Sequence, residues 1–244
     1  MSDALLAIDG LTKQFGGVTA VDHCSFQVQT GTVTALIGPN GSGKTTAFNM
    51  ITGYLKADSG TIRFRGETIT RPRPADLYRR GLSRTFQQAR IFPELSVEEN
   101  LVVAAGYSWP QLFGRRVSTS DRERARTMLQ EFRLEPLAQL PARELSYGQR
   151  KLVEFAAVLT SEPTLVLLDE PTAGVNPVMI DAMERHIRQR HAEGVTFLVV
   201  EHDMQLVMRL CDPVIVLDRG APIAFGSPEH VQTDPRVLEA YLGA

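Results

Sequence analysis

The stretch Gly38-Pro39-Asn40-Gly41-Ser42-Gly43-Lys44-Thr45 decides the fold class, because it fits the pattern G-x4-G-K-[ST]. It follows the β-branched, apolar run 32–37 and precedes a segment of helical character at 44–50. Glycines let backbone N–H groups converge on an anion, and the first turn of a helix adds the positive end of its dipole. A plain glycine turn is the alternative. The order strand, loop, helix favours a phosphate-binding loop, in which Lys44 reaches the β- and γ-phosphates and Thr45 holds Mg²⁺.

A second group of polar residues follows another apolar strand. The run Leu165-Val166-Leu167-Leu168 ends directly in Asp169 and Glu170. In an open α/β sheet, ligands bind beyond the carboxyl ends of the strands. Without the phosphate loop, a solvated strand end would be the better interpretation. With it, we expect Asp169 beside the metal and Glu170 in position to polarise an attacking water.

The pattern of apolar residues divides the chain into three parts. Strands are expected in the first third, at 5–8, 18–28 and 32–37, with a hairpin across 61–69 and a short helix that Asp76 could cap. Helical spacing dominates from 84 to 160, at 97–105, 120–132 and 145–159, with a Gly/Pro/aromatic stretch at 106–113. The rest alternates: strand 165–168, helix 177–191, strand 195–200, helix 204–210, strand 214–217. Such alternation predicts a mostly parallel sheet covered by helices on both faces.

Composition excludes several classes of protein. The 244 residues are 43% hydrophobic and 22% charged, which is typical of a globular chain. The net charge of −2 disfavours a nucleic-acid partner. A basic cluster at 115–126 is interrupted by Asp121 and Glu123, so a solvated helix face explains it better. Two distant cysteines exclude a disulfide scaffold and a zinc–cysteine site. Because the first residues lack a signal-peptide pattern and no apolar run approaches ~18–20 residues, we expect a cytoplasmic protein.

Three further motifs complete a recognisable set. A Ser/Gly helix start, Leu145-Ser146-Tyr147-Gly148-Gln149, opens an amphipathic helix; Gln87 follows Arg84-Thr85-Phe86; and His202 follows Val199-Val200-Glu201. With the phosphate loop and the acidic strand end, their order and spacing closely resemble the ATP-binding-cassette (ABC) ATPases over nearly the whole chain. The resemblance implies a single α/β domain over 1–244. Its P-loop NTPase (RecA-like) core, with a mostly parallel sheet and an N-terminal antiparallel β subdomain, would take 1–84 and 160–244, and an inserted α-helical signature subdomain would take 85–159.

The resemblance also implies roles for individual residues, with ATP and Mg²⁺ bound together. Glu170 would be the general base, His202 the contact to the γ-phosphate, and Gln87 the sensor of Mg²⁺ and water. Phe15 would stack on adenine, unless it is a core aromatic. The metal would lie near Thr45, Gln87 and Asp169. The residues expected to contact the nucleotide are Phe15, Gly38, Pro39, Asn40, Gly41, Ser42, Gly43, Lys44, Thr45, Thr46, Ser146, Gly148 and Gln149.

Ser146 and Gly148 look like the signature that closes over ATP held by the opposite subunit. The working unit would then be a head-to-tail pair, formed by two copies or by this chain and a homologous ATPase subunit. Most of the family has Asp where this chain has Asn176, so the loop that crosses the pair departs here from the family pattern. Asn176 also has a structural role available, as the N-cap before Pro177.

The segments 173–177, 201–204 and 234–243, with Arg84-Thr85-Phe86-Gln87, are similar to the ATPase subunits of branched-chain amino acid importers. This implies an ATP-driven motor at the inner face of the membrane, bound to separate permease subunits and served indirectly by a substrate-binding protein. Residues 87–92 would contact the permeases, although ordinary packing is an equal alternative for them. Other substrates (urea or amide import, lipopolysaccharide export) share parts of the pattern. A soluble ABC ATPase of translation or DNA repair is disfavoured by the single phosphate loop and the absence of heptads, and a simple kinase would not need the signature helix.

Overall fold

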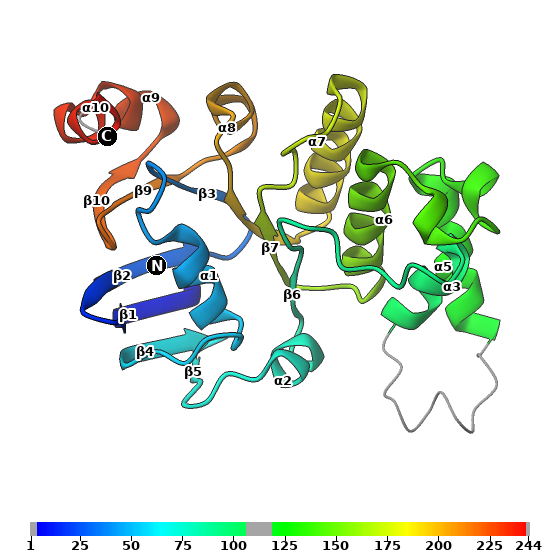
Figure 1. The fold of residues 1–244 in the computed structure, drawn as a ribbon, viewed down its shortest axis with the longest axis horizontal. Helices are drawn as coiled ribbons and strands as arrows, with labels where there is room; N and C mark the ends of the chain where they lie inside the picture. The colour runs from blue at the N-terminus through cyan, green and yellow to red at the C-terminus, as the bar shows by residue number, and fades with distance from the viewer. Residues whose placement is uncertain (1–3, 106–118, 243–244) are drawn as a thin grey trace. The chain divides into compact units, whose positions relative to one another are not determined.

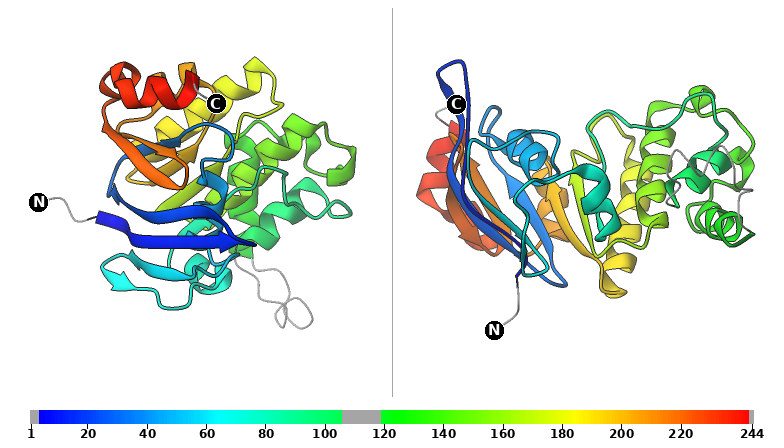
Figure 2. Two further views of the ribbon diagram at one scale, coloured as in Figure 1. Left: turned by 60° about the vertical axis from the view of Figure 1, so that its left-hand side comes forward. Right: turned by 90° about the horizontal axis from the view of Figure 1, so that it is seen from below.

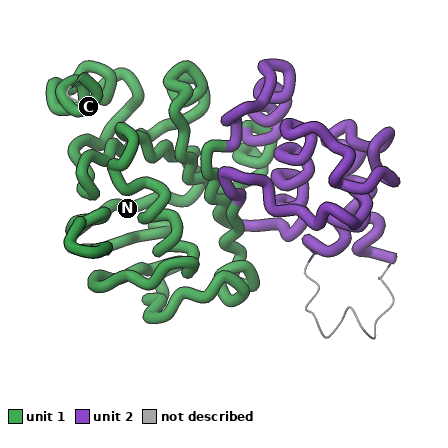
Figure 3. The backbone as a smooth tube through the Cα atoms, in the orientation of Figure 1, with its two compact units in different colours: residues 1–84, 164–170, 188–244 green, residues 85–163, 171–187 purple. Residues whose placement is uncertain are grey.

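The computed structural model describes residues 4–105 and 119–242, so the whole stretch 106–113 and the residues Arg115 and Arg116 lie outside the described chain. The chain forms two compact units, which are shown in different colours in Figure 3. Unit 1 comprises 1–84, 164–170 and 188–244, and unit 2 comprises 85–163 and 171–187. The domain boundaries expected from the sequence stay a prediction, and each unit is described by itself.

Unit 1 contains a six-stranded sheet in the order β10-β9-β3-β8-β7-β6 (Figure 1). Five strands run parallel: β3 (Val33–Ile37), β6 (Leu82–Arg84), β7 (Leu165–Asp169), β8 (Thr196–Val200) and β9 (Val214–Asp218). Strand β10 (Ala221–Gly226) pairs antiparallel with β9. Every residue of β3, β7 and β8 is buried, which explains why these strands are continuous apolar runs in the sequence. The prediction of a mostly parallel sheet is confirmed.

A second sheet in unit 1 is antiparallel, in the order β2-β1-β4-β5. Its strands are β1 (Ala4–Phe15), β2 (Val18–Gln29), β4 (Ser59–Phe64) and β5 (Glu67–Thr68). The hairpin between β4 and β5 is confirmed, with Gly66 in the left-handed region at φ 78°. Strand β1 extends well beyond the 5–8 expected from the sequence. Its register shifts against β2 between Ile8 and Lys13, and such irregularities interrupt the two-residue alternation by which a strand is recognised.

The helices of unit 1 are short. They are α1 (Lys44–Ile51), α2 (Pro74–Arg79), α8 (Met204–Leu210), α9 (Pro228–Thr233) and α10 (Pro235–Leu242). Helix α1 packs against β1 and β2 of one sheet and β7 of the other. Its residues Phe48, Met50 and Ile51 are buried in the core. Figure 2 shows the ribbon from two further sides. The expectation that Asp76 caps α2 is wrong. The helix begins two residues earlier, at Pro74, whose ring fixes a helical φ, and Asp76 instead pairs with Arg79 within the helix.

Unit 2 is helical. It contains α3 (Val97–Ala104), α5 (Thr119–Glu131), α6 (Tyr147–Thr160), the first part of α7 (Pro177–Ala192), and two short 3₁₀ turns, Glu135–Leu137 and Ala142–Glu144. Helix α3 begins with a capping box, in which Ser96 and Glu99 each bond the other's backbone N–H. In the core, Phe132 meets Phe155 edge to face at 5.8 Å between centroids and stacks on His186 at 3.8 Å. No helix among the described residues has the length and hydropathy of a membrane span.

Candidate active site

The strand register of unit 1 gathers the phosphate loop, Asp169, Glu170 and His202 at one edge of the parallel sheet. Leu36 of β3 and Asp169 of β7 both pair with Val200 of β8, so the carboxyl ends of the three strands coincide. The phosphate loop follows β3, Asp169 and Glu170 end and follow β7, and His202 lies just beyond β8. This is the edge of an α/β sheet at which ligands bind.

The phosphate loop has a backbone that only glycine can adopt at two of its positions. A Cβ on Gly38 would lie 2.1 Å from the carbonyl oxygen of Leu217, and a Cβ on Gly43 would lie 2.4 Å from that of Ala20. Gly43 is the N-cap of α1 with φ 99°. The loop is therefore closely fitted to its surroundings, and α1 begins directly at Lys44, as the sequence predicted.

The Lys44 side chain folds back onto its own loop. Its Nζ donates to the carbonyl oxygens of Gly38 at 2.8 Å and Pro39 at 2.9 Å, and to Oγ of Ser42 at 3.4 Å. Burial lowers the pKa of Lys44, against the opposing effect of the negative charges of Glu170 and Asp169. The Lys44 ammonium group thus interacts electrostatically with the carboxylates of Glu170 and Asp169, so the phosphate loop and the acidic strand end belong to one charged site.

Asp169 is held by a residue that the sequence analysis did not assign to the site. Nη2 of Arg84 donates to Oδ2 of Asp169 at 2.6 Å, and the two side chains are only 5% and 3% exposed. Nη1 of Arg84 donates to Oδ1 of Asn49 at 2.7 Å and to Oγ1 of Thr52 at 2.8 Å. Arg84 therefore fastens Asp169 to helix α1. The sequence contained one signal, an arginine beside buried apolar strand residues, but its partner is 85 positions away.

Glu170 and His202 form a direct contact. Nε2 of His202 lies 2.9 Å from Oε1 of Glu170, and the Glu170 backbone N–H donates to the carbonyl of Val200 at 2.9 Å. Glu170 has φ 47°, in the left-handed region, where a residue with a side chain is strained by roughly 1–2 kcal/mol. Strain of this kind concentrates at functional sites. The arrangement places the Glu170 carboxylate beside the His202 imidazole, at the edge of the sheet where the phosphate loop begins.

Phe15 ends strand β1 and is 49% exposed, so it is not a core aromatic. The Nζ of Lys13 lies 5.5 Å from the centroid of its ring. An accessible ring face is what stacking on a base requires, and the role of Phe15 toward adenine stays a prediction.

The remaining predicted site residues belong to unit 2. Ser146 caps α6: its Oγ accepts from the backbone N–H of Gln149 at 3.3 Å, and Oε1 of Gln149 accepts from the N–H of Ser146 at 2.8 Å. A Cβ on Gly148 would lie 2.8 Å from Sδ of Met179, so this position is kept small by α7. The hydroxyl of Tyr147 donates to the backbone carbonyl of Gln87 at 3.1 Å. The structure thus groups Gln87 with the signature helix.

The residues present fit a magnesium ion that is shared with phosphates. Mg²⁺ keeps several waters and is bound through one or two protein oxygens together with substrate phosphates. Thr45, at the start of α1, and Asp169, which Arg84 ties to the same helix, offer such oxygens. Within the described residues no group of three or more His, Cys, Asp or Glu side chains forms a complete metal site.

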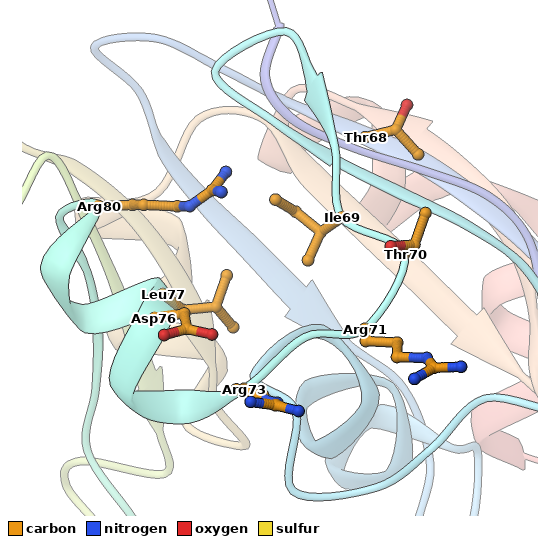
Figure 4. A pocket seen from close by; sticks show the side chains of 8 residues that line it. All are labelled: Thr68, Ile69, Thr70, Arg71, Arg73, Asp76, Leu77 and Arg80. Atoms are coloured by element: carbon orange, nitrogen blue, oxygen red, sulfur yellow. The ribbon is translucent and has the colours of Figure 1, made fainter.

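A surface pocket of about 120 Å³ lies elsewhere in unit 1, beside β5 and α2 (Figure 4). None of the predicted site residues lines it. Two of its charged groups are engaged with neighbours, since Arg80 pairs with Glu67 and Asp76 pairs with Arg79. The sheet edge therefore stays the predicted location of the chemistry.

Comparison with known proteins agrees with this geometry. Residues 21–173 match the family described as ABC transporter, and residues 221–244 match the family described as branched-chain amino acid ATP-binding cassette transporter. The high-affinity branched-chain amino acid transport ATP-binding protein BraF of Pseudomonas aeruginosa is 40% identical, with 100% of this chain and 99% of BraF covered. LivG of Escherichia coli K12, a protein of the same description, is 38% identical, with 100% and 99% covered.

A solved structure, the nucleotide-free ATP-binding cassette of an ABC transporter, superposes with a TM-score of 0.88 at 37% identity and covers 99% of this chain and 100% of its own. The fold expected from the sequence is thereby confirmed. Because the ABC transporter model spans more than half of the residues and these relatives align with the protein from end to end, the chain belongs to the ABC transporter family.

Proposed function

We propose that the chain is the ATP-hydrolysing motor subunit of an importer of branched-chain amino acids. The observation that carries the proposal is the meeting of the phosphate loop, Asp169, Glu170 and His202 at one sheet edge in a member of the ABC transporter family. The substrate class is supported by the match of residues 221–244 and by the names of the relatives.

Binding of ATP begins at the phosphate loop. The backbone N–H groups of the loop and the first turn of α1 accept the triphosphate, and Lys44 turns from the carbonyls of Gly38 and Pro39 to the β- and γ-phosphates. The exposed ring of Phe15 stacks on adenine. Thr45 and Asp169 would hold Mg²⁺, which when bound neutralises charge on the β- and γ-phosphates.

Hydrolysis proceeds by in-line attack of water on the γ-phosphorus. Glu170 accepts the proton of this water as the new P–O bond forms and the bond to the bridging oxygen breaks, which releases ADP and inorganic phosphate. Lys44 and His202 donate to the oxygens on which charge develops. The 2.9 Å contact between Nε2 of His202 and Oε1 of Glu170 holds the proposed base beside the proposed γ-phosphate contact. By resemblance to the family, Gln87 orients the water.

The active unit is a pair of ATPase subunits, in which Ser146 and Gly148 of one subunit close over the ATP of the other. Asn176 serves as the N-cap of α7, since its Oδ1 accepts from the N–H of Met179 at 3.0 Å. Permease subunits bind the pair at the inner face of the membrane, and a substrate-binding protein delivers the cargo to them. Phe92, which is 52% exposed, supports the proposal that residues 87–92 form part of the permease contact.

A purified chain tests the first part of the proposal. Phosphate release is measured against protein concentration, and a rate per chain that rises with concentration supports the paired unit, whereas an invariant rate contradicts it. The substrate is tested in cells that lack the gene. Loss of uptake of labelled leucine, isoleucine and valine, with uptake of urea unchanged, supports the branched-chain assignment, and the reverse result refutes it.

A further inference from the structure

Three side chains of helix α6 hold one short segment of unit 2, residues 86–90. Tyr147, Lys151 and Glu154 are spaced four and three residues apart, so they lie on the same face of the helix. Each of them bonds the backbone of this segment, which contains Gln87. The same helix begins with the capping residue Ser146 and with Gly148.

The contacts fix both ends of the segment. Oε1 of Glu154 accepts from the backbone N–H of Phe86 at 3.2 Å and from that of Arg90 at 2.9 Å. Nζ of Lys151 donates to the carbonyl of Phe86 at 2.9 Å, and the Tyr147 hydroxyl donates to the carbonyl of Gln87 at 3.1 Å. The Arg90 guanidinium lies 3.8 Å from the centroid of the Phe86 ring, so the segment also closes on itself.

The two charged members of this group are buried at a cost in desolvation. Lys151 is 1% exposed and Glu154 is 4% exposed. Oε2 of Glu154 is buried without a hydrogen-bond partner, and burial raises the pKa of this carboxyl to about 7. An apolar side chain would pack at either position without this penalty. The gain that offsets the penalty is the set of bonds to residues 86–90.

We propose that Tyr147, Lys151 and Glu154 are positioning residues that clamp residues 86–90 to α6, so that Gln87 and the helix tip at Ser146 and Gly148 move as one piece. This inference rests on the proposed function. When nucleotide binds the tip of α6 and moves it, Gln87 moves with it, because residues 86–90 cannot shift against the helix without breaking these bonds. The clamp thereby links nucleotide binding to the placement of the catalytic glutamine.

Hydrogen exchange of the full chain, with and without MgATP, tests the clamp in a Glu170→Gln background that retains the nucleotide. The variants are Glu154→Ala and Lys151→Met. Glu154→Gln keeps an acceptor oxygen and serves as the conservative rescue, and Glu144→Gln, an exposed carboxylate before α6, is the matched control. In the Glu170→Gln protein whose clamp residues are unchanged, the peptides covering 84–92 and 145–152 both gain protection from hydrogen exchange when MgATP is added. In Glu154→Ala the second peptide still gains protection, while the first exchanges roughly 10-fold faster and ceases to respond.

Turnover gives a second readout, in the chain with Glu170 intact. For Glu154→Ala we expect kcat to fall about 10-fold, comparable to the loss of one buried hydrogen-bonded contact, with KM within about twofold of wild type. Glu154→Gln restores most of kcat. If Glu154→Ala fails to fold, the double variant Lys151→Met/Glu154→Leu, which removes both buried charges, carries the same prediction.

The outcomes separate the clamp from the proposed function. A folded clamp variant with wild-type kcat and with joint protection of both peptides overturns the clamp. A wild-type chain that neither gains protection at 38–45 with MgATP nor releases phosphate overturns the proposed function itself.

Discussion

Nη2 of Arg84 lies 2.6 Å from Oδ2 of Asp169, and both side chains are almost completely buried. The same guanidinium reaches Asn49 and Thr52 of helix α1, which begins at the phosphate loop. One arginine therefore sets the position of the acidic strand end relative to the helix that carries Thr45. The stability of the fold and the placement of Asp169 therefore depend on the same group, the Arg84 guanidinium.

Replacing Arg84 by Ala should destabilise the fold, because it leaves the Asp169 carboxylate buried without its partner. A loss of about 3–5 kcal/mol is expected in urea unfolding monitored by circular dichroism. The control is Arg79→Ala, which removes the exposed pair with Asp76 and should change stability far less. Equal losses in the two variants would contradict the assigned role.

Glu170→Gln should retain ATP binding and lose turnover, because the amide cannot accept the proton of the attacking water. The kcat for phosphate release should fall by about 10²–10⁴-fold, and the pair should be trapped with ATP in gel filtration. Glu239→Gln, at an exposed site on α10, should behave as wild type. Undiminished phosphate release by Glu170→Gln would refute the assignment of the base.

Lys44→Ala should weaken nucleotide binding, because it removes charge-assisted hydrogen bonds to the phosphates. A rise in Kd of about 10–100-fold is expected for a fluorescent ATP analogue. Lys56→Ala, which removes an exposed lysine from the same unit, provides the control. Tight binding by Lys44→Ala would count against the phosphate-loop role.

The buried carboxyl of Glu154 should make stability depend on pH. Its pKa is raised by burial from 4.5 to about 7 in the folded chain, so between these values the folded state keeps a proton that the unfolded state has lost. The wild type should therefore lose stability relative to Glu154→Gln as pH rises through this window, by up to about 3 kcal/mol. Urea unfolding of both proteins at several pH values measures the difference. A difference that is independent of pH would show that Glu154 is ionised throughout.

Both cysteines should be unreactive in the folded chain. Cys24 and Cys211 are buried, and burial raises the pKa of the Cys24 thiol to about 12. Ellman's reagent should detect almost no thiol in the native protein and two per chain in denaturant. Rapid native labelling of Cys24 would indicate that the β1–β2 region opens readily.

The sequence predicted those features of the fold that depend on neighbouring residues. The runs that became β3, β7 and β8 are apolar because the strands are buried on both faces, and Ser146 caps α6 through a local bond to Gln149. The carboxyl ends of parallel strands lie at the same edge of a sheet, so residues that directly follow such strands in the sequence are expected to come together. Asp169, Glu170 and His202 therefore lie at the same edge as the phosphate loop.

Features that depend on distant partners escaped prediction. Lys151 and Glu154 have the residue types of a solvated helix face, but their partners in the segment 86–90 lie more than 60 positions away in the sequence. Strand β6 is only three residues long and has no pattern of its own. Asp76 was misassigned because an acidic residue suits the first turn of a helix as well as its cap.

The bonds from Lys44 to the carbonyls of Gly38 and Pro39 are made within the phosphate loop itself and hold its shape. An arriving triphosphate therefore exchanges one set of partners for another and does not have to order a loose chain. Recognition of this preorganised kind loses little conformational entropy, so the rate of association should be set by encounter and not by a folding step.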